Sequence, residues 1–410
     1  MATVVFVWEL GDGFGHLVRY RPLIERLAAA GHRVVFHAAA EARAQQVFAD
    51  LPVEVRPAPR GTTRRPDLVP SPNSFAEVLW NTGYAEVEAV AARLAHWRQV
   101  FQTERPAVVI ADYAPSAVIA CRVLGVRCIA AGNGFYVPVR CSPLPPYRRV
   151  HDGRAERAIL TEQKLLAVLD AATRRLGAHP TSSVADAVMP PETFLLTFPE
   201  FDPMAEHRDA ATEYLGAWPS DGFGSRPEFP DGRTKVFCYV DVNKMPERLW
   251  RVLEQSEAGV VVVNRAGNAA PRHFLNKSNV KVMQNLADLT SAAHACDAGV
   301  TSGALNSTLA LLLAGKPVLA MPVNLEQYLN ATRLERAGAG LAAPATAPGD
   351  LEAKFGALLA DRDLRRGARR FAARHGSEDA ATTAERMLAR LSLPPARPEP
   401  GRPHRTKAGE

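Results

Sequence analysis

The sequence predicts an α/β protein with two successive doubly wound domains that face each other. First, its 410 residues exceed the roughly 250–300 at which a single hydrophobic core stops growing. Second, short apolar runs alternate with amphipathic helical patterns in both halves, which is typical of mostly parallel sheets. Third, a stretch rich in Pro, Gly and acidic residues, 198–233, separates the halves.

The first half begins with a strand–helix–strand pattern. We expect a buried strand at 3–8, a Gly-rich turn at 11–15, an amphipathic helix at 17–30 and a second strand at 33–37. The alternation continues with helices at 75–101 and 116–124 and with strands at 107–111, 127–131 and 193–197. The irregular aromatic stretch 133–147 is expected to form a wall of a binding cleft.

The second half repeats the pattern. Strands are expected at 236–240, 259–264, 280–283, 298–301 and 317–321, with helices between them. Because doubly wound sheets bind ligands beyond the carboxyl ends of their strands, a ligand is expected in the crevice between the domains. We predict domains at 1–215 and 216–390 and a disordered tail at 391–410, which contains five prolines.

Composition excludes several classes of protein. With 47% hydrophobic and 22% charged residues, the chain is globular rather than disordered. No apolar run reaches the roughly 20 residues of a membrane helix, and no basic leader precedes residues 1–8, so neither a span nor a secretion signal is predicted. Five cysteines without paired spacing indicate reduced thiols and a cytoplasmic location. The net charge of +6 comes from arginines scattered among acidic residues, so no nucleic-acid partner is predicted.

The turn Gly11-Asp12-Gly13-Phe14-Gly15 leads into His16, where the first helix begins. A dinucleotide-binding turn is a weaker interpretation, since the spacing is not Gly-x-Gly-x-x-Gly and no acidic residue clearly ends the second strand. A neutral imidazole at this position can accept a proton from a hydroxyl group, which is the work of a general base. A histidine that merely caps the helix is the alternative.

Asp112 follows the strand expected at 107–111. A carboxylate at that strand end, in the same domain as His16, can orient the imidazole and stabilise its protonated form. Asp112 can equally cap the helix that follows Pro115, and the spacing alone does not decide between the two roles.

Two segments of the second half are candidate ligand sites. Small polar residues stand between a strand and an apolar helix at 301–308, where free backbone N–H groups and the helix dipole favour an anion. Glu326 and Gln327 follow the strand expected at 317–321 and offer acceptors and donors for vicinal sugar hydroxyls. An ordinary capped helix is the alternative for the first segment, and an exposed cap for the second.

These segments together resemble the family-one, UDP-glycosyltransferase-like enzymes, which include macrolide and aglycone glycosyltransferases. The donor-half motifs are Ser-Gly-Ala-Leu-Asn-Ser-Thr at 302–308, Ala-Gly-Lys-Pro at 314–317, Glu-Gln-Tyr-Leu-Asn-Ala at 326–331 and Gly-Ala-Gly at 338–340. The amino-terminal motifs are Gly-His-Leu at 15–17, Pro-Leu at 22–23 and Ala-Gly-His at 30–32. The motifs lie in the right order in opposite halves, and the resemblance covers roughly residues 1–390.

The resemblance implies the GT-B fold, in which two Rossmann-like domains face each other, with the acceptor in the first and the donor in the second. It implies His16 as the base and Asp112 as its partner. The implied donor contacts are Gly303, Ala304, Asn306, Ser307 and Thr308 at the phosphates and Glu326 with Gln327 at the sugar. The implied co-substrate is a nucleoside diphosphate sugar of the UDP or dTDP type, with no other cofactor and no metal ion.

The sequence departs from the family pattern at two places. Ser302 stands where the family usually has a histidine, so one side-chain donor to the diphosphate is missing or replaced by a hydroxyl. The loop after the strand at 236–240 reads Asp241-Val-Asn-Lys244 instead of Gly with Ser or Thr. Lys244 is a candidate replacement for the lost phosphate contact, and Asp241 would oppose it. No aromatic platform is evident at 283–285, which leaves the nucleotide base open.

The expected reaction is an inverting, metal-independent transfer to a small-molecule, lipid or peptide acceptor. The aromatic residues expected to line the acceptor site are Trp80, Tyr84, Phe135, Tyr136 and Tyr147. The Asp-x-Asp match at 361–363 is interpreted as a solvated helical face. The alternatives are a non-catalytic paralogue that binds nucleotide or a partner enzyme and, less favoured, a sugar-nucleotide epimerase. A monomer or a homodimer is expected.

Overall fold

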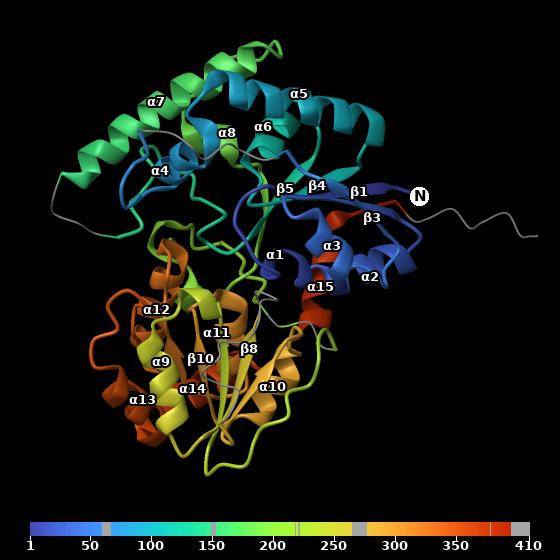
Figure 1. Cartoon of the computed structure of the whole chain (residues 1–410). Helices are drawn as coiled ribbons and strands as arrows, with labels where there is room; N and C mark the ends of the chain where they lie inside the picture. The colour runs from blue at the N-terminus through green and yellow to red at the C-terminus, as the bar shows by residue number, and fades with distance from the viewer. Residues whose placement is uncertain are drawn as a thin grey trace, which may run out of the picture.

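The computed structural model describes residues 1–59, 67–148, 153–217, 219, 222–264, 277–377 and 379–394. It consists of two α/β halves, each built on a parallel sheet of six strands (Figure 1). The predicted fold class is therefore confirmed. Most of the predicted tail, residues 395–410, lies outside the described residues.

The first sheet has the strand order β3-β2-β1-β4-β5-β6. Its strands are β1 (Thr3–Trp8), β2 (Arg33–Ala38), β3 (Val53–Pro57), β4 (Val108–Asp112), β5 (Cys128–Gly132) and β6 (Glu192–Leu195). The order reverses between β1 and β4, where Trp8 pairs with Asp112. The chain thus leaves two neighbouring strands in opposite directions at one point, which opens a crevice beyond their carboxyl ends.

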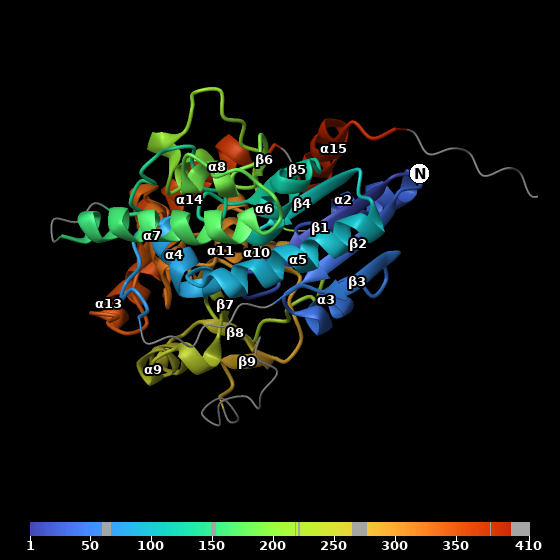
Figure 2. The same ribbon diagram turned by 90° about the horizontal axis from the view of Figure 1, so that it is seen from above.

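Helices cover both faces of this sheet. On one face lie α1 (Gly15–Val18), α2 (Arg21–Ala29), α3 (Glu41–Val47) and α15 (Ala380–Leu391). On the other lie α4 (Phe75–Leu79), the π-helical turn η1 (Trp80–Tyr84), α5 (Val87–Glu104), α6 (Pro115–Leu124), α7 (Arg154–Arg174) and α8 (Val184–Val188). Figure 2 shows α5 and α7 running across the outside of this half.

Two helices expected from the periodicity are broken in the structure. The helix predicted at 17–30 divides into α1 and α2, because Pro22 lacks the N–H that would bond to the carbonyl of Val18. The helix predicted at 75–101 is interrupted at Gly83, which takes a φ of 90°. Both breaks change the direction of the chain close to the crevice.

The second sheet has the order β12-β11-β10-β7-β8-β9, which is the same winding as in the first half. Its strands are β7 (Lys235–Val240), β8 (Gly259–Asn264), β9 (Val280–Met283), β10 (Ala298–Thr301), β11 (Val318–Ala320) and β12 (Gly340–Ala342). Its helices are α9 (Glu247–Gln255) and α13 (Leu351–Ala360) on one face and α10 (Leu289–Ala295), α11 (Leu305–Leu313), α12 (Leu325–Arg336) and α14 (Arg362–His375) on the other. Short 3₁₀ turns lie at η2 (Pro199–Phe201), η3 (Ala205–His207) and η4 (Val242–Lys244).

The last helix, α15, returns to the first half. Its residues Ala384, Met387 and Leu391 are buried in the same core as Leu23 and Leu27 of α2, and the two helices lie side by side in Figure 1. This differs from the predicted range of the second domain, 216–390. The spacing of the three residues predicts an apolar helical stripe, but a stripe does not reveal which sheet it will cover.

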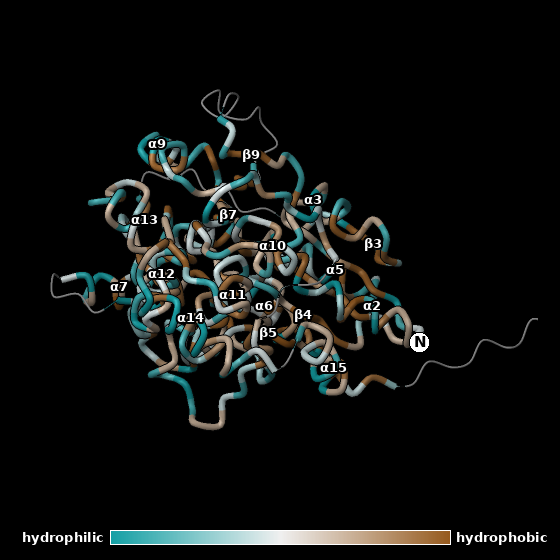
Figure 3. The backbone as a smooth tube through the Cα atoms, turned by 90° about the horizontal axis from the view of Figure 1, so that it is seen from below, coloured by the Kyte–Doolittle hydropathy of each residue, from teal (hydrophilic) through white to brown (hydrophobic). Residues whose placement is uncertain are grey.

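Apolar segments gather inside both halves, and hydrophilic segments lie mainly at the periphery, for example on α9 (Figure 3). The strands β4, β5 and β8 are buried along their whole length. None of the described helices has the length and apolar composition that a membrane span requires.

Candidate active site

A cavity of about 500 Å³ lies between the two halves. Its walls come from the loops that follow β1, β4 and β5 in the first half and β7, β9, β10 and β11 in the second. All these loops lie at the carboxyl ends of parallel strands, where the fold leaves side chains and backbone groups free to face a ligand. The predicted position of the ligand thus coincides with this cavity.

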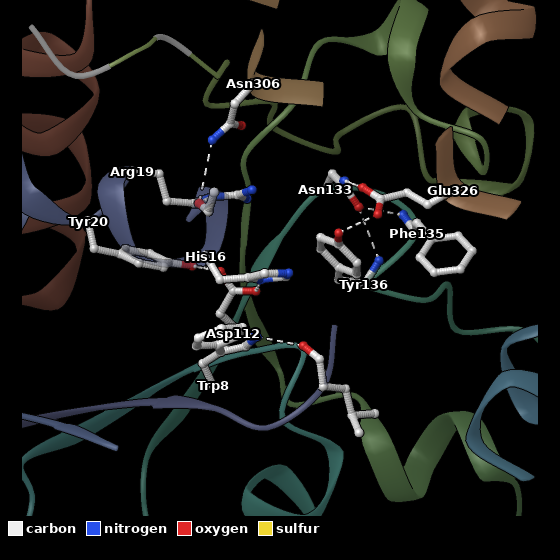
Figure 4. A network of polar contacts seen from close by, with 12 residues as sticks. Trp8, His16, Arg19, Tyr20, Asp112, Asn133, Phe135, Tyr136, Asn306 and Glu326 are labelled. Atoms are coloured by element: carbon white, nitrogen blue, oxygen red, sulfur yellow. Dashed lines mark hydrogen bonds and ion pairs between the residues drawn. The ribbon is translucent and has the colours of Figure 1, made fainter. Parts of the chain in front are cut away.

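His16 and Asp112 meet at the switch point of the first sheet. His16 lies in α1 just beyond β1, and Asp112 ends β4. Nδ1 of His16 is 2.8 Å from Oδ1 of Asp112, and Tyr20 donates its hydroxyl to Oδ2 at 2.8 Å. All three side chains are buried (Figure 4). The pairing of His16 with Asp112 that the sequence suggests is therefore present, and Asp112 does not serve as a side-chain cap of α6.

The pair fixes which imidazole nitrogen is free. The Asp112 carboxylate accepts the proton of Nδ1, so Nε2 retains its lone pair. Burial, and then the charge of Asp112, raise the pKa of Tyr20 well above its usual value, so Tyr20 remains a donor. His16 itself lines the cavity. The arrangement can remove a proton from a bound hydroxyl group.

Ring packing holds the imidazole in place. Trp8 stacks on His16 with ring centres 5.0 Å apart, and Tyr136 lies on it at 4.8 Å. Gly11 lies beside Nε2, and a Cβ on Gly11 would come within 2.8 Å of that nitrogen. Gly11 also has a φ of 84°, so two independent reasons require glycine at this position beside Nε2 of His16.

The segment predicted to bind phosphate divides into two groups. Ala304, Asn306 and Ser307 line the cavity at the beginning of α11. No side chain caps this helix at Ala304, so its first N–H groups are available to an anion.

Ser302, Gly303 and Thr308 lie behind that surface. Ser302 is 2% exposed, and its hydroxyl is buried with no hydrogen-bond partner among the described residues. Thr308 bonds to the Thr301 hydroxyl at 3.0 Å. Gly303 has a φ of 79°, and a Cβ there would come within 2.7 Å of the Gln327 carbonyl oxygen. None of the three is among the residues that line the cavity.

Glu326, Gln327 and Lys244 all line the cavity. Glu326, at the start of α12, spans the crevice and accepts hydrogen bonds from Asn133 at 2.9 Å and from the Tyr136 hydroxyl at 2.5 Å (Figure 4). Gln327 accepts a bond from the backbone N–H of Val323 at 3.0 Å.

The lysine offered in place of the missing histidine is already paired. Nζ of Lys244 lies 3.2 Å from Oδ2 of Asp241. The opposition of Asp241 expected from the sequence is thus present in the structure.

Of the aromatic residues expected at the acceptor site, Phe135 and Tyr136 line the cavity, whereas Trp80, Tyr84 and Tyr147 do not. Tyr84 is fully buried and donates to Glu9 at 2.8 Å, and buried Tyr147 donates to the Phe135 carbonyl at 3.1 Å. Trp80 packs against the core of the first half. Tyr84 and Tyr147 lie in the core and half-buried Trp80 packs against it, so none of the three is among the residues that line this cavity.

Three residues near the cavity, Arg19, Tyr20 and Tyr113, were not predicted from the sequence as site residues. Asn133 was predicted only as part of the cleft wall at 133–147, without a role of its own. Arg19 and Tyr20 stand three and four positions after His16, a spacing that places side chains on one face of a continuous helix. Asn133 and Tyr113 follow strands that were predicted, and position after a parallel strand is the signal that finds them.

The Asp-x-Asp match lies away from the cavity. Asp361 caps α14 by accepting the N–H of Asp363, and Asp363 pairs with Arg366. Among the described residues, no cluster of His, Cys, Asp and Glu is arranged to hold a metal ion.

Comparisons with known proteins find relatives that cover most of the chain. The PGL/p-HBAD biosynthesis glycosyltransferase of Mycobacterium tuberculosis is 24% identical over 362 residues, which cover 82% of this chain and 80% of the relative. No family model matches the chain.

Solved structures give the fold. The glycotransferase of kitacinnamycin has a TM-score of 0.71 at 19% identity, with 96% of this chain and 99% of that chain covered. A calicheamicin glycosyltransferase gives 0.68 at 19%, covering 95% and 98%. A spinosyn rhamnosyltransferase complexed with thymidine diphosphate gives 0.63 at 16%, covering 95% and 100%. The fold likeness confirms the predicted GT-B fold, and the sequence relative agrees with the predicted glycosyltransferase class.

Proposed function

We propose that this protein is an inverting glycosyltransferase that moves a sugar from a nucleoside diphosphate to an acceptor hydroxyl. One observation carries the proposal. His16, which bonds to the buried Asp112 carboxylate, and the uncapped start of α11 line the same cavity from opposite halves. A base on one side and an anion site on the other is the arrangement that glycosyl transfer needs.

The chemistry follows from the positions of these groups. Nε2 of His16 takes the acceptor proton as the acceptor oxygen attacks the anomeric carbon. The bond from that carbon to the phosphate oxygen breaks, and its electron pair leaves with the nucleoside diphosphate. Asp112 stabilises the imidazolium that forms. The amides of α11 bear part of the charge on the leaving group, so we propose a reaction that is independent of metal ions.

The donor would lie along the second half. The diphosphate would face Ala304, Asn306 and Ser307, and the sugar would face Glu326 and Gln327. Each Glu326 oxygen accepts one bond, from Asn133 or from Tyr136, and retains a second lone pair that can accept a sugar hydroxyl.

The nucleotide base would pack on the loop after β9, where Leu286 and Ala287 line the cavity. Thymidine diphosphate in the spinosyn rhamnosyltransferase supports a dTDP or UDP donor. These assignments make the second half the donor half.

The acceptor side is aromatic. Tyr113, Phe135 and Tyr136 line it together with Phe14 and Val78. Flat apolar walls suit a small aromatic or polyketide-like acceptor more than a peptide. The names of the structural neighbours, which refer to natural products, support this choice. The five cysteines are all free thiols, which supports a location in the reducing cytoplasm.

The proposal is tested by titrating the protein with nucleoside diphosphates and the matching monophosphates. We expect one diphosphate to bind and raise the melting temperature, and its sugar to be transferred or slowly hydrolysed in chelator-treated protein. Binding without turnover on a panel of acceptors would favour the non-catalytic paralogue. If no nucleoside diphosphate binds, both the glycosyltransferase and the non-catalytic nucleotide-binding paralogue are contradicted. If a chelator inactivates the enzyme and magnesium or manganese restores its activity, the proposed independence of metal ions is contradicted.

A further inference from the structure

Arg19 is a half-buried cation whose position the reaction scheme above does not use. It follows His16 by three residues in the turn between α1 and α2, and it lines the same cavity. Its Nε donates to the Gly15 carbonyl at 2.6 Å, while its Nη1 is buried and has no hydrogen-bond partner among the described residues. Figure 4 shows Arg19 on the side of His16 that faces Asn306.

A guanidinium that is partly removed from water and has an unpaired N–H group raises the free energy of the protein unless a ligand bonds to it. Withdrawing a cation from water is repaid only by hydrogen bonds and opposite charge. Burial acts to lower the pKa of Arg19, but the negative charge of Asp112 raises it, and the net shift is upward. The side chain therefore remains protonated and retains an N–H group without a hydrogen-bond partner among the described residues.

The neighbours of Arg19 belong to the phosphate region of the second half. Asn306 is close to Gly15, with 3.5 Å from its Nδ2 to the Gly15 carbonyl oxygen, and Gly15 is also the acceptor for Arg19. Among the described residues that line the cavity, only Arg19 and Lys244 are cationic, and Lys244 is paired with Asp241. Of these two cations, Arg19 is the one with an N–H donor that has no partner among the described residues, and it belongs to the first half.

We propose that Arg19 binds the β-phosphate of the nucleoside diphosphate and compensates for the absence of a side-chain donor at position 302. This inference rests on the proposed function. As the bond to the anomeric carbon breaks, its electron pair moves onto the β-phosphate oxygen, and the Arg19 guanidinium donates a hydrogen bond to that phosphate. Because Arg19 and His16 share one segment, a bound diphosphate would also tie the half that carries the base to the half that carries the donor.

The test compares diphosphate with monophosphate binding in variants of the full chain. Arg19→Met should weaken binding of the nucleoside diphosphate that binds the wild type about 10- to 100-fold, as expected for a charge-assisted hydrogen bond. It should weaken the corresponding monophosphate by less than about 3-fold, because the β-phosphate is absent. Arg19→Lys should fall between wild type and Arg19→Met. Arg98→Met, at an exposed position of α5, is the matched control and should change neither affinity.

The outcomes separate this inference from the function itself. Equal losses for diphosphate and monophosphate, or no loss for either, would overturn the role of Arg19 while leaving a nucleotide-binding glycosyltransferase intact. A wild type that binds no nucleoside diphosphate would contradict the proposed function. If Arg19→Met does not fold, the ratio of the two affinities in Arg19→Lys decides, since a shift of that ratio supports the contact and an unchanged ratio overturns it.

Discussion

The two halves have the same strand order but place different groups at their switch points. In the first half, a buried histidine, carboxylate and tyrosine hydroxyl bond to one another between β1 and β4. In the second half, small residues expose backbone N–H groups beyond β10, and the polar side chain of Ser302 turns away from the cavity. One scaffold thus supplies an oriented imidazole on one side and an anion site on the other.

The difference shows where function resides in a duplicated architecture. The winding opens a crevice at the same place in each sheet, and the residues after the strands decide its chemistry. A base requires burial and a partner that fixes its tautomer, whereas an anion site requires close approach to the backbone. Variants that affect one requirement alone should therefore separate catalysis from donor binding.

Replacing His16 should have the largest effect. His16→Ala removes the group that takes the acceptor proton, so transfer should fall about 10²- to 10⁴-fold. Nucleoside diphosphate binding should change little, because the proposed phosphate contacts are Arg19 and the start of α11 rather than the His16 imidazole. Steady-state rates and calorimetric titration measure the two quantities separately.

Asp112→Asn is the companion to this variant. It retains the shape of the side chain but removes the charge that stabilises the imidazolium, so it should slow transfer less severely than His16→Ala. An active His16→Ala enzyme with a normal pH profile would remove His16 from the mechanism. Full activity in Asp112→Asn would leave Asp112 with a structural role only.

Much of the fold could be predicted because its strands are continuous apolar runs. β1, β8 and β10 lie at the predicted residues, since a strand covered on both faces is largely apolar along its length. β9 also lies at the predicted residues, although it is an edge strand with Lys281 exposed. β3 was missed because its residues are largely exposed or half-buried, and β12 because it is short and two of its residues are half-buried. The packing of α15 on the first sheet could not be predicted, because amphipathicity does not identify the sheet that a helix covers.

The site could be predicted where the order of the strands in the sheet is enough to bring its residues together. His16 and Asp112 follow neighbouring strands, so pairing between strands decides their contact. The direction of Ser302 depends instead on the positive φ of Gly303 and on the approach of Gln327, which is a contact between distant loops. Arg19 was missed because its significance comes from Asn306 in the other half.

The halves should also differ in their response to acid. Burial lowers the pKa of His37 in β2 to about 4, although its contact with the Pro57 carbonyl opposes the shift. In the described part of the second half, His294 is exposed and His375 half-buried. Below the ordinary pKa of about 6.5, the unfolded chain binds a proton that folded His37 does not, so stability falls with pH.

His37 contributes stability that is fully present above pH 6.5 and is lost as pH falls toward 4, by up to about 3 kcal/mol. Hydrogen exchange at pH 7 and pH 5 should show the first half losing protection before the second. His37→Gln should reduce that difference, and His179→Gln, at an exposed position, should not. Equal loss of protection in both halves would contradict the assignment to His37.

Ser302→Ala should have the smallest effect and tests the comparison most directly. The resemblance to known enzymes suggests that this hydroxyl replaces an imidazole at the diphosphate, but the structure buries it without a partner among the described residues and outside the cavity lining. Removing an unsatisfied buried hydroxyl should leave nucleotide affinity unchanged and stabilise the fold by about 1 kcal/mol or less. Ser307→Ala, at a residue that lines the cavity, is the matched comparison. If Ser302→Ala weakens diphosphate binding and Ser307→Ala does not, the second half uses the side chain at position 302 to bind the diphosphate. The contrast between an oriented base in the first half and an anion site made of backbone N–H groups in the second would then be wrong.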